Sequence, residues 1–197
     1  MGAVALVRGS PPLGEPRIHG RNPTNPSNES RPMSTELFSS VIDSPVGPLT
    51  IVATDQGVRA ILWPDDDPTR VRLDTSIENP DHRVISMTVT QLSEYFDGER
   101  TDFDVPLDPV GTEFQRAAWD ALRSIPYGTT VSYGEQAERM GDRRKARAVG
   151  AANGRNPISI VVPCHRVVGA DGTLTGFAGG TDTKAWLIEH ERRQLSR

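Results

Sequence analysis

The side chains that could do chemistry gather around a single cysteine. Cys164 is the only cysteine in the chain, and it lies in the sequence Pro163-Cys164-His165-Arg166. A free thiol has a pKa of about 8.5, and a hydrogen-bonded histidine or a nearby cation lowers it. The adjacent His165 and Arg166 therefore predict a thiolate nucleophile. The alternative is a small buried hydrophobe, which is the usual role of a lone cysteine.

The segments on either side of Cys164 could enclose it in a pocket. Residues 157–162 form an apolar run that ends at Pro163, a pattern typical of a buried strand or extended segment. A glycine-rich loop at 176–180 follows at a distance suited to forming one wall of a pocket. We therefore expect the thiol at the end of a buried segment, facing a pocket.

Three helices are predicted between the middle of the chain and Cys164. Thr112 and Ser132 are each followed three residues later by Gln or Glu, which is the spacing of a capping box at a helix start. The first helix carries an apolar stripe of Phe114, Ala118, Ala121, Leu122 and Ile125. The second helix ends at Gly141, and the third spans residues 143–153. A helix, a short glycine-containing turn and a basic helix make a helix-turn-helix arrangement.

The third helix has the features of a nucleic-acid contact. Its cations are Arg143, Arg144, Lys145 and Arg147, and such groups replace the counterions that surround phosphate. Small residues share the helix and would permit a close backbone approach: Ala146, Ala148, Gly150, Ala151 and Ala152. The alternative is a solvated charged face, which would not need these small residues.

The N-terminal half has strand-like periodicity. Residues 37–43, 48–53 and 58–63 are apolar segments separated by turn-forming residues, which predicts a three-stranded antiparallel meander. Residues 82–96 repeat apolar side chains near the helical period, and Gly98 would end that helix. The predicted fold class is α+β, with a small α/β domain at 34–106 and a mostly helical domain at 110–197.

Charge is divided unevenly along the chain. The formal net charge is −4, yet residues 33–109 hold five Arg and fifteen acidic residues, whereas 110–197 hold thirteen Lys or Arg and nine acidic residues. This asymmetry indicates that the C-terminal part meets an anionic partner.

Composition also excludes several classes of protein. Residues 1–33 are rich in Pro and Gly and are expected to be a disordered extension, with Met33 as an alternative start. No apolar run approaches the roughly 18 residues of a membrane-spanning helix. One cysteine cannot form a disulfide within the chain, which fits a reducing cytoplasm, and it leaves no paired cysteines for a structural zinc site.

These motifs together resemble one family. Pro163-Cys164-His165-Arg166-Val167-Val168, preceded by Gly154-Arg155-Asn156-Pro157, is similar to the active-site motif of the O6-alkylguanine-DNA alkyltransferases. The similarity covers residues 110–191, including 131–135, 146–150 and 184–187, and is looser over 39–96. The resemblance implies an RNase H-like N-terminal domain and a winged-helix-like C-terminal domain with the helix-turn-helix.

The resemblance also implies a role for each residue of the reaction. Cys164 would take the alkyl group from O6-alkylguanine in DNA, and less well from O4-alkylthymine. His165 would deprotonate Cys164 through a water, and Glu191 would orient His165. Asn156 would hold the turn around the thiol, and Tyr133 would protonate guanine N3.

Further residues would bind DNA or line the pocket for a flipped base. Arg147 would enter the base stack, with a phosphate contact as the alternative, and the helix would lie in the minor groove. The other expected DNA contacts are Arg143, Arg144, Lys145, Ala146 and Arg155, and the expected pocket residues are Val167, Phe177, Ala178, Gly179 and Asn153. Two of these residues depart from the family pattern. Many relatives have Tyr at the position of Phe177, and some have an apolar residue at the position of Asn153.

The family acts without a cofactor, and the thioether would make each molecule a single-use reagent. We expect a cytoplasmic monomer whose binding to duplex DNA could be cooperative. We expect neither a bound metal nor association with a membrane. Three alternatives are a relative that binds the lesion without taking the alkyl group, a helix-turn-helix regulator with an incidental thiol, and a cysteine hydrolase. The intact Pro-Cys-His-Arg motif argues against the first, and the adjacency of the only nearby histidine argues against the third.

Overall fold

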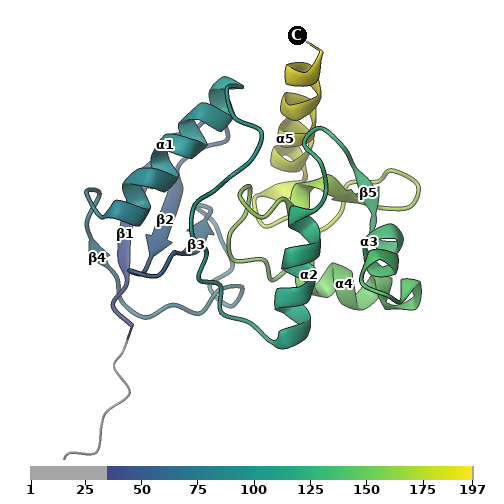
Figure 1. Cartoon of the computed structure of the whole chain (residues 1–197), viewed down its shortest axis with the longest axis horizontal. Helices are drawn as coiled ribbons and strands as arrows, with labels where there is room; N and C mark the ends of the chain where they lie inside the picture. Colours follow the sequence, from purple (N-terminus) through teal and green to yellow (C-terminus); the bar gives the residue numbers. More distant parts are fainter. Residues whose placement is uncertain (1–34, 197) are drawn as a thin grey trace, which may run out of the picture. The chain divides into compact units, whose positions relative to one another are not determined.

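A four-stranded sheet covered by one helix forms the first half of the structure (Figure 1). The computed structural model describes residues 35–196, so the predicted extension at 1–33 and the alternative start lie outside it. The elements are β1 (Phe38–Ile42), β2 (Leu49–Ala53), β3 (Val58–Leu62), β4 (Ile77–Glu78) and α1 (Arg83–Asp97). The meander is confirmed, since β1 pairs antiparallel with β2 and β2 with β3. The two residues of β4 add a parallel edge strand to β1 that the sequence did not predict.

Local chemistry explains the meander and its helix. Gly47 turns the chain between β1 and β2 at a φ of 96°, and its amide donates to the carbonyl of Ser44. Strand β2 is buried along most of its length because α1 covers one face of the sheet. The covering face of α1 buries Val84, Ile85, Leu92 and Tyr95.

The second half is mostly helical, as predicted. Its elements are α2 (Glu113–Arg123), β5 (Val131–Ser132), α3 (Tyr133–Arg139), η1 (Arg143–Lys145), α4 (Ala146–Asn153), η2 (Cys164–Arg166), β6 (Val167–Val168) and α5 (Gly180–Leu195). Both predicted capping boxes are present, at Thr112 and Ser132. Strands β5 and β6 form a short parallel pair that places the chain after Cys164 beside the start of α3.

Two predicted elements differ from the structure. The basic helix predicted at 143–153 is a 3-10 turn, η1, followed by α4, because the Asp142 side chain accepts from the amide of Arg144 and caps a separate turn. Residues 157–162 are buried as expected, yet they form tight turns instead of a strand. Ile160 lies at a φ of 75°, and the amides of Val161 and Val162 donate to carbonyls two and four residues earlier.

The two halves share one hydrophobic core. Ile61 of β3 and Ile158 of the buried turn segment belong to the same buried cluster, which also contains Cys164. The amide of Ile61 donates to the carbonyl of Pro157 over 2.8 Å. The guanidinium of Arg70 is buried as well, and it donates to the carbonyls of Ile61 and Asn156. The sheet therefore supports the segment that carries the thiol.

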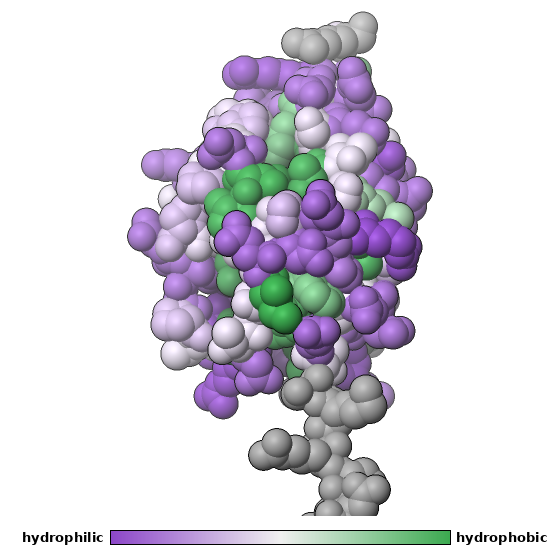
Figure 2. All heavy atoms as spheres, turned by 90° about the vertical axis from the view of Figure 1, so that its left-hand side faces the viewer, coloured by the Kyte–Doolittle hydropathy of each residue, from purple (hydrophilic) through white to green (hydrophobic). Residues whose placement is uncertain are grey.

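The outer face near α1 and the sheet edge is mainly polar. Figure 2 shows its apolar atoms in small groups separated by polar side chains. The large exposed apolar residues of β1 and β4 are Val41 and Ile77. No helix within residues 35–196 is long and apolar enough to cross a membrane.

Candidate active site

Cys164 begins the turn η2 and is buried, with 8% of its surface exposed. The Asn156 side-chain amide donates to Cys164 Sγ over 3.2 Å and to the carbonyl of Val162 over 2.8 Å. The Asn156 carbonyl oxygen accepts from the amide of Ile158 over 3.1 Å. One buried side chain thus holds the thiol and both sides of the turn in place.

The buried surroundings of Cys164 favour the protonated form of its thiol. Burial raises its pKa above the usual value, and the hydrogen bond from Asn156 and the charge of Lys184 oppose that effect only in part. The sequence predicted that the adjacent His165 and Arg166 stabilise a thiolate, but within residues 35–196 the side chain that hydrogen-bonds Sγ is that of Asn156. The side chains of His165 and Arg166 turn to Glu191 instead. The thiol needs a base during the reaction.

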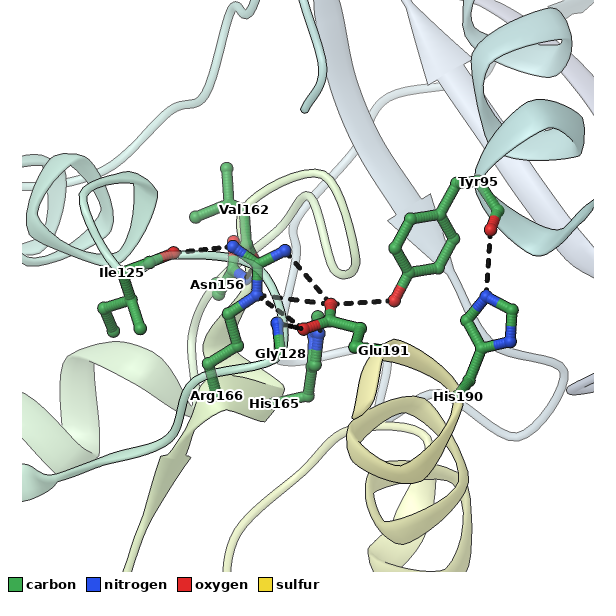
Figure 3. A network of polar contacts seen from close by, with 9 residues as sticks. All are labelled: Tyr95, Ile125, Gly128, Asn156, Val162, His165, Arg166, His190 and Glu191. Atoms are coloured by element: carbon green, nitrogen blue, oxygen red, sulfur yellow. Dashed lines mark hydrogen bonds and ion pairs between the residues drawn. The ribbon is translucent and has the colours of Figure 1, made fainter. Parts of the chain in front are cut away.

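Glu191 is the centre of a buried network that joins α1, η2, α5 and the loop between α2 and β5 (Figure 3). Its Oε1 lies 2.7 Å from His165 Nε2, and its two oxygens accept from Arg166 Nε and Nη2 over 3.0 Å each. The amide of Gly128 donates to Oε2 over 2.8 Å, and the Tyr95 hydroxyl donates to Oε1 over 2.9 Å. Arg166 also donates to the carbonyl of Ile125.

The electrostatics of this network favour a neutral imidazole beside a carboxylate. Burial raises the pKa of Glu191, but hydrogen bonds from His165 and Arg166 and their charges outweigh it and lower the pKa to about 2. Burial lowers the pKa of His165, against the opposing effect of Glu191. His165 Nδ1 is buried and has no hydrogen-bond partner in residues 35–196. This nitrogen is free to accept a proton while Nε2 faces Glu191.

Tyr133 and Lys184 form a second polar pair close to the thiol. The Tyr133 hydroxyl donates to the carbonyl of Thr175 over 3.1 Å, and Lys184 Nζ donates to the same oxygen over 2.9 Å. Lys184 is fully buried, with Nζ 5.8 Å from the centre of the Tyr133 ring. Burial lowers the pKa of Lys184, and burial raises that of Tyr133.

A cavity of about 550 Å³ lies against the glycine-rich loop, and its lining includes neither Cys164 nor Tyr133. Its lining comes from the loop after β3, the end of α4 and the glycine-rich loop, and includes Arg155, Phe177 and Ala178. Phe177 lies edge-on to Trp63 with the ring centres 5.5 Å apart. A Cβ atom on Gly179 would lie 2.8 Å from the Trp63 ring, so only glycine permits this approach.

Two other residues expected in the pocket lie deeper in the fold. Val167 is fully buried in β6. The Asn153 side chain is buried between α3 and α4, where it exchanges two hydrogen bonds with the side chain of Gln136. Asn153 is not among the residues that line the cavity.

The residues expected to contact DNA lie on the exposed side of η1 and α4. Arg143 pairs with Glu138, and Arg144 pairs with Asp142. Lys145 and Arg147 are exposed and form no ion pair within the described chain, and Ala146 is half-buried between them. Arg155 follows α4, and its side chain donates to the carbonyl of Thr69. No group of three potential metal ligands occurs within residues 35–196.

Comparison with known proteins places this arrangement in a family. The model of the 6-O-methylguanine DNA methyltransferase ribonuclease-like domain matches residues 37–109, and that of the DNA binding domain of the same enzyme matches 113–193. A methylated-DNA–protein-cysteine methyltransferase of Mycolicibacterium paratuberculosis is 51% identical over 154 residues, 77% of this chain and 90% of the relative. The chain belongs to the 6-O-methylguanine DNA methyltransferase family.

Other members of this methyltransferase family agree in sequence and in structure. The methylated-DNA–protein-cysteine methyltransferase of Methanosarcina acetivorans is 43% identical over 155 residues, 79% of this chain and 98% of the relative. The Mycobacterium tuberculosis O6-methylguanine methyltransferase has a TM-score of 0.72 at 46% identity, covering 80% of this chain and 94% of that one. An OGT of the same organism, solved in complex with DNA, has a TM-score of 0.72 at 45% identity, covering 81% and 94%.

Three residues of the methyltransferase site were not assigned from the sequence: Tyr95, Gly128 and Lys184. Lys184 had a usable signal, because Lys184, Leu187, Ile188 and Glu191 have the spacing of one helical face and all four are buried in α5. Gly128 and Tyr95 reach Glu191 from 63 and 96 residues away in sequence. No local pattern indicates such contacts.

Proposed function

We propose that this chain repairs duplex DNA by moving the alkyl group from O6 of guanine onto Cys164. The single observation that carries the proposal is the buried thiol of Cys164, held by Asn156, next to a buried His165 whose Nε2 lies 2.7 Å from Glu191 Oε1. A thiol of raised pKa is inert until a base removes its proton, which restricts its reactivity to a bound substrate. The family and its DNA-bound member support this reaction class.

The reaction begins with proton transfer away from the thiol. His165 Nδ1 accepts the proton of Cys164 through a bridging water, and Glu191 stabilises the imidazolium that forms. The Sγ atom then attacks the alkyl carbon, so that an S–C bond forms while the bond from carbon to guanine O6 breaks. The electron pair of the broken bond stays with guanine. Tyr133 then gives its hydroxyl proton to guanine N3, which improves the leaving group.

The structure indicates what Tyr133 must give up to do this. Its hydroxyl donates to the carbonyl of Thr175, and Lys184 donates to the same oxygen. When guanine N3 replaces Thr175 as the acceptor, Lys184 still satisfies that carbonyl. The Lys184 charge also lies near the thiolate and the phenolate as they develop, and it stabilises both.

The product is a thioether, and no second nucleophile displaces it. Each molecule therefore acts once, on O6-alkylguanine and less well on O4-alkylthymine. Access to a stacked base requires flipping the nucleotide out of the duplex, and the glycine-rich loop with Phe177 and Ala178 lies on the side from which the base would approach the thiol. We propose that α4 enters the minor groove, with Lys145 on phosphate and Arg147 in the vacated stack. A monomeric state and a cytoplasmic location stay predictions.

A single-turnover repair assay tests the proposal. Equimolar protein and duplex carrying one O6-methylguanine are mixed, and the lesion remaining in the DNA is measured beside the variant Cys164→Ser. We expect loss of one lesion per protein molecule, and none with the variant. Tight, lesion-selective binding without loss of the lesion would indicate a binding module instead. Sequence-selective binding without preference for the lesion would indicate a regulator.

A further inference from the structure

A tyrosine of the N-terminal half reaches the proton relay of the C-terminal half. Tyr95 is fully buried in α1, and its hydroxyl donates to Glu191 Oε1 over 2.9 Å. The same oxygen lies 2.7 Å from His165 Nε2 (Figure 3). Tyr95 and His165 therefore share one carboxylate oxygen, which also accepts from Arg166 Nη2 over 3.0 Å.

This hydroxyl can only be a donor in the resting protein. Burial raises the pKa of Tyr95 well above its usual value, and the negative charge of Glu191 raises it further. Glu191 is ionised and offers acceptors alone. A donated hydrogen bond withdraws negative charge from the oxygen that faces His165, so the carboxylate attracts the imidazolium less strongly.

The backbone of Tyr95 is fixed to the same helix as its hydroxyl. His190 Nε2 lies 2.9 Å from the Tyr95 carbonyl oxygen, and His190 directly precedes Glu191 in α5. The Tyr95 ring packs against Phe103 and Tyr127, with centre-to-centre distances of 5.4 and 6.0 Å. These contacts leave the hydroxyl little freedom to leave Glu191.

We propose that Tyr95 is a positioning residue that sets the proton affinity of His165 through Glu191. Its hydroxyl orients the Glu191 carboxylate and withdraws negative charge from Oε1. A residue of the N-terminal half thereby adjusts the pKa of His165, the base in the C-terminal half. The inference rests on the proposed alkyl transfer. It assigns to the ribonuclease-like half a part in the chemical step beyond packing.

The variant Tyr95→Phe removes the hydroxyl and keeps the ring. A matched control is Tyr127→Phe, because the Tyr127 hydroxyl is also buried near Glu191 but has no hydrogen-bond partner in residues 35–196. The transfer rate on O6-methylguanine duplex is measured under single-turnover conditions across pH for both variants. Without the donor, Glu191 attracts the imidazolium more strongly, which raises the pKa of His165. In Tyr95→Phe, the fall of the transfer rate at low pH should therefore move to higher pH by about 0.5 to 1 unit. In Tyr127→Phe, the transfer rate should fall at the same pH as in the parent protein.

A second measurement keeps this inference separate from the reaction itself. The titration of the His165 ring is followed by NMR in the parent protein and in both variants. We expect the same upward shift for Tyr95→Phe alone. An unchanged His165 titration, or a Tyr95→Phe rate profile that differs only in height, would overturn the inference. A parent protein that transfers no methyl group would refute the proposed function, and the NMR titration would still decide the role of Tyr95.

Discussion

Replacing Glu191 by glutamine removes a charge from the centre of the buried network. Glu191 is 1% exposed, and its carboxylate is the partner of Arg166, which is itself buried. Breaking a buried ion pair from one side costs about 3–5 kcal/mol, because the remaining charge is left uncompensated. The pKa shift of Glu191 gives a similar free energy. A carboxylate whose pKa falls from its usual 4.5 to about 2 on folding contributes about 3 kcal/mol at pH 7.

The expected loss for Glu191→Gln is therefore about 3 kcal/mol of unfolding free energy. For a chain of this size that lowers Tm by roughly 6–12 °C. Since the pKa of Glu191 is lower in the folded state, its contribution is fully present above pH 4.5 and is lost as the pH falls toward 2. The stabilities of the parent and the variant should therefore converge on acidification.

Urea denaturation across pH measures this effect, and Glu189→Gln is the matched control. Glu189 lies two residues away in α5, but its side chain is 52% exposed and pairs with Arg193 at the surface. Such a pair contributes less than about 0.5 kcal/mol. Two results would refute the assigned role of the buried carboxylate. One is an equal loss of unfolding free energy in the two variants, and the other is a loss in Glu191→Gln that stays unchanged as the pH falls.

Three further substitutions and one product state are expected to behave as follows. Asn156→Ala should cost about 2 kcal/mol of unfolding free energy in urea denaturation, because it leaves the buried amide of Ile158 without a partner and removes one of two donors from the carbonyl of Val162, and should slow transfer; a neutral result would contradict its role. Gly179→Ala should slow transfer, since its Cβ meets the Trp63 ring; an unchanged rate would show that this loop adapts freely. Lys145→Gln should reduce the salt dependence of DNA binding by about one phosphate contact; an unchanged slope would remove Lys145 from the interface. The methylated protein should lose about 1–3 kcal/mol of unfolding free energy, since a methyl group on Sγ of Cys164 crowds the Asn156 side chain; a higher Tm would contradict this.

Local sequence signals predicted most of the architecture. The meander depends on apolar alternation and on turns such as that at Gly47, and the helix starts at Thr112 and Ser132 depend on capping boxes that span four residues. Strands of two residues, such as β4, are too short to leave a periodic pattern. Their formation depends on a neighbouring strand.

The environment of the thiol could not be predicted from its neighbours in sequence. Cys164, His165 and Arg166 form one 3-10 turn, in which successive side chains point about 120° apart. In the folded chain His165 and Arg166 both reach Glu191 of α5, whereas the Cys164 thiol accepts from Asn156. Adjacency in the chain suggested a lowered thiol pKa, whereas the fold raises it.

Whether Cys164 keeps the alkyl group is decided by the mass of its peptide after the reaction. The protein is incubated with duplex carrying one O6-methylguanine, digested, and compared with a sample treated with unmodified duplex. We expect one added methyl group per chain, on the peptide that contains Cys164, and none in Cys164→Ser. An unchanged Cys164 peptide, with the lesion still in the DNA or the methyl group on another residue, would contradict it.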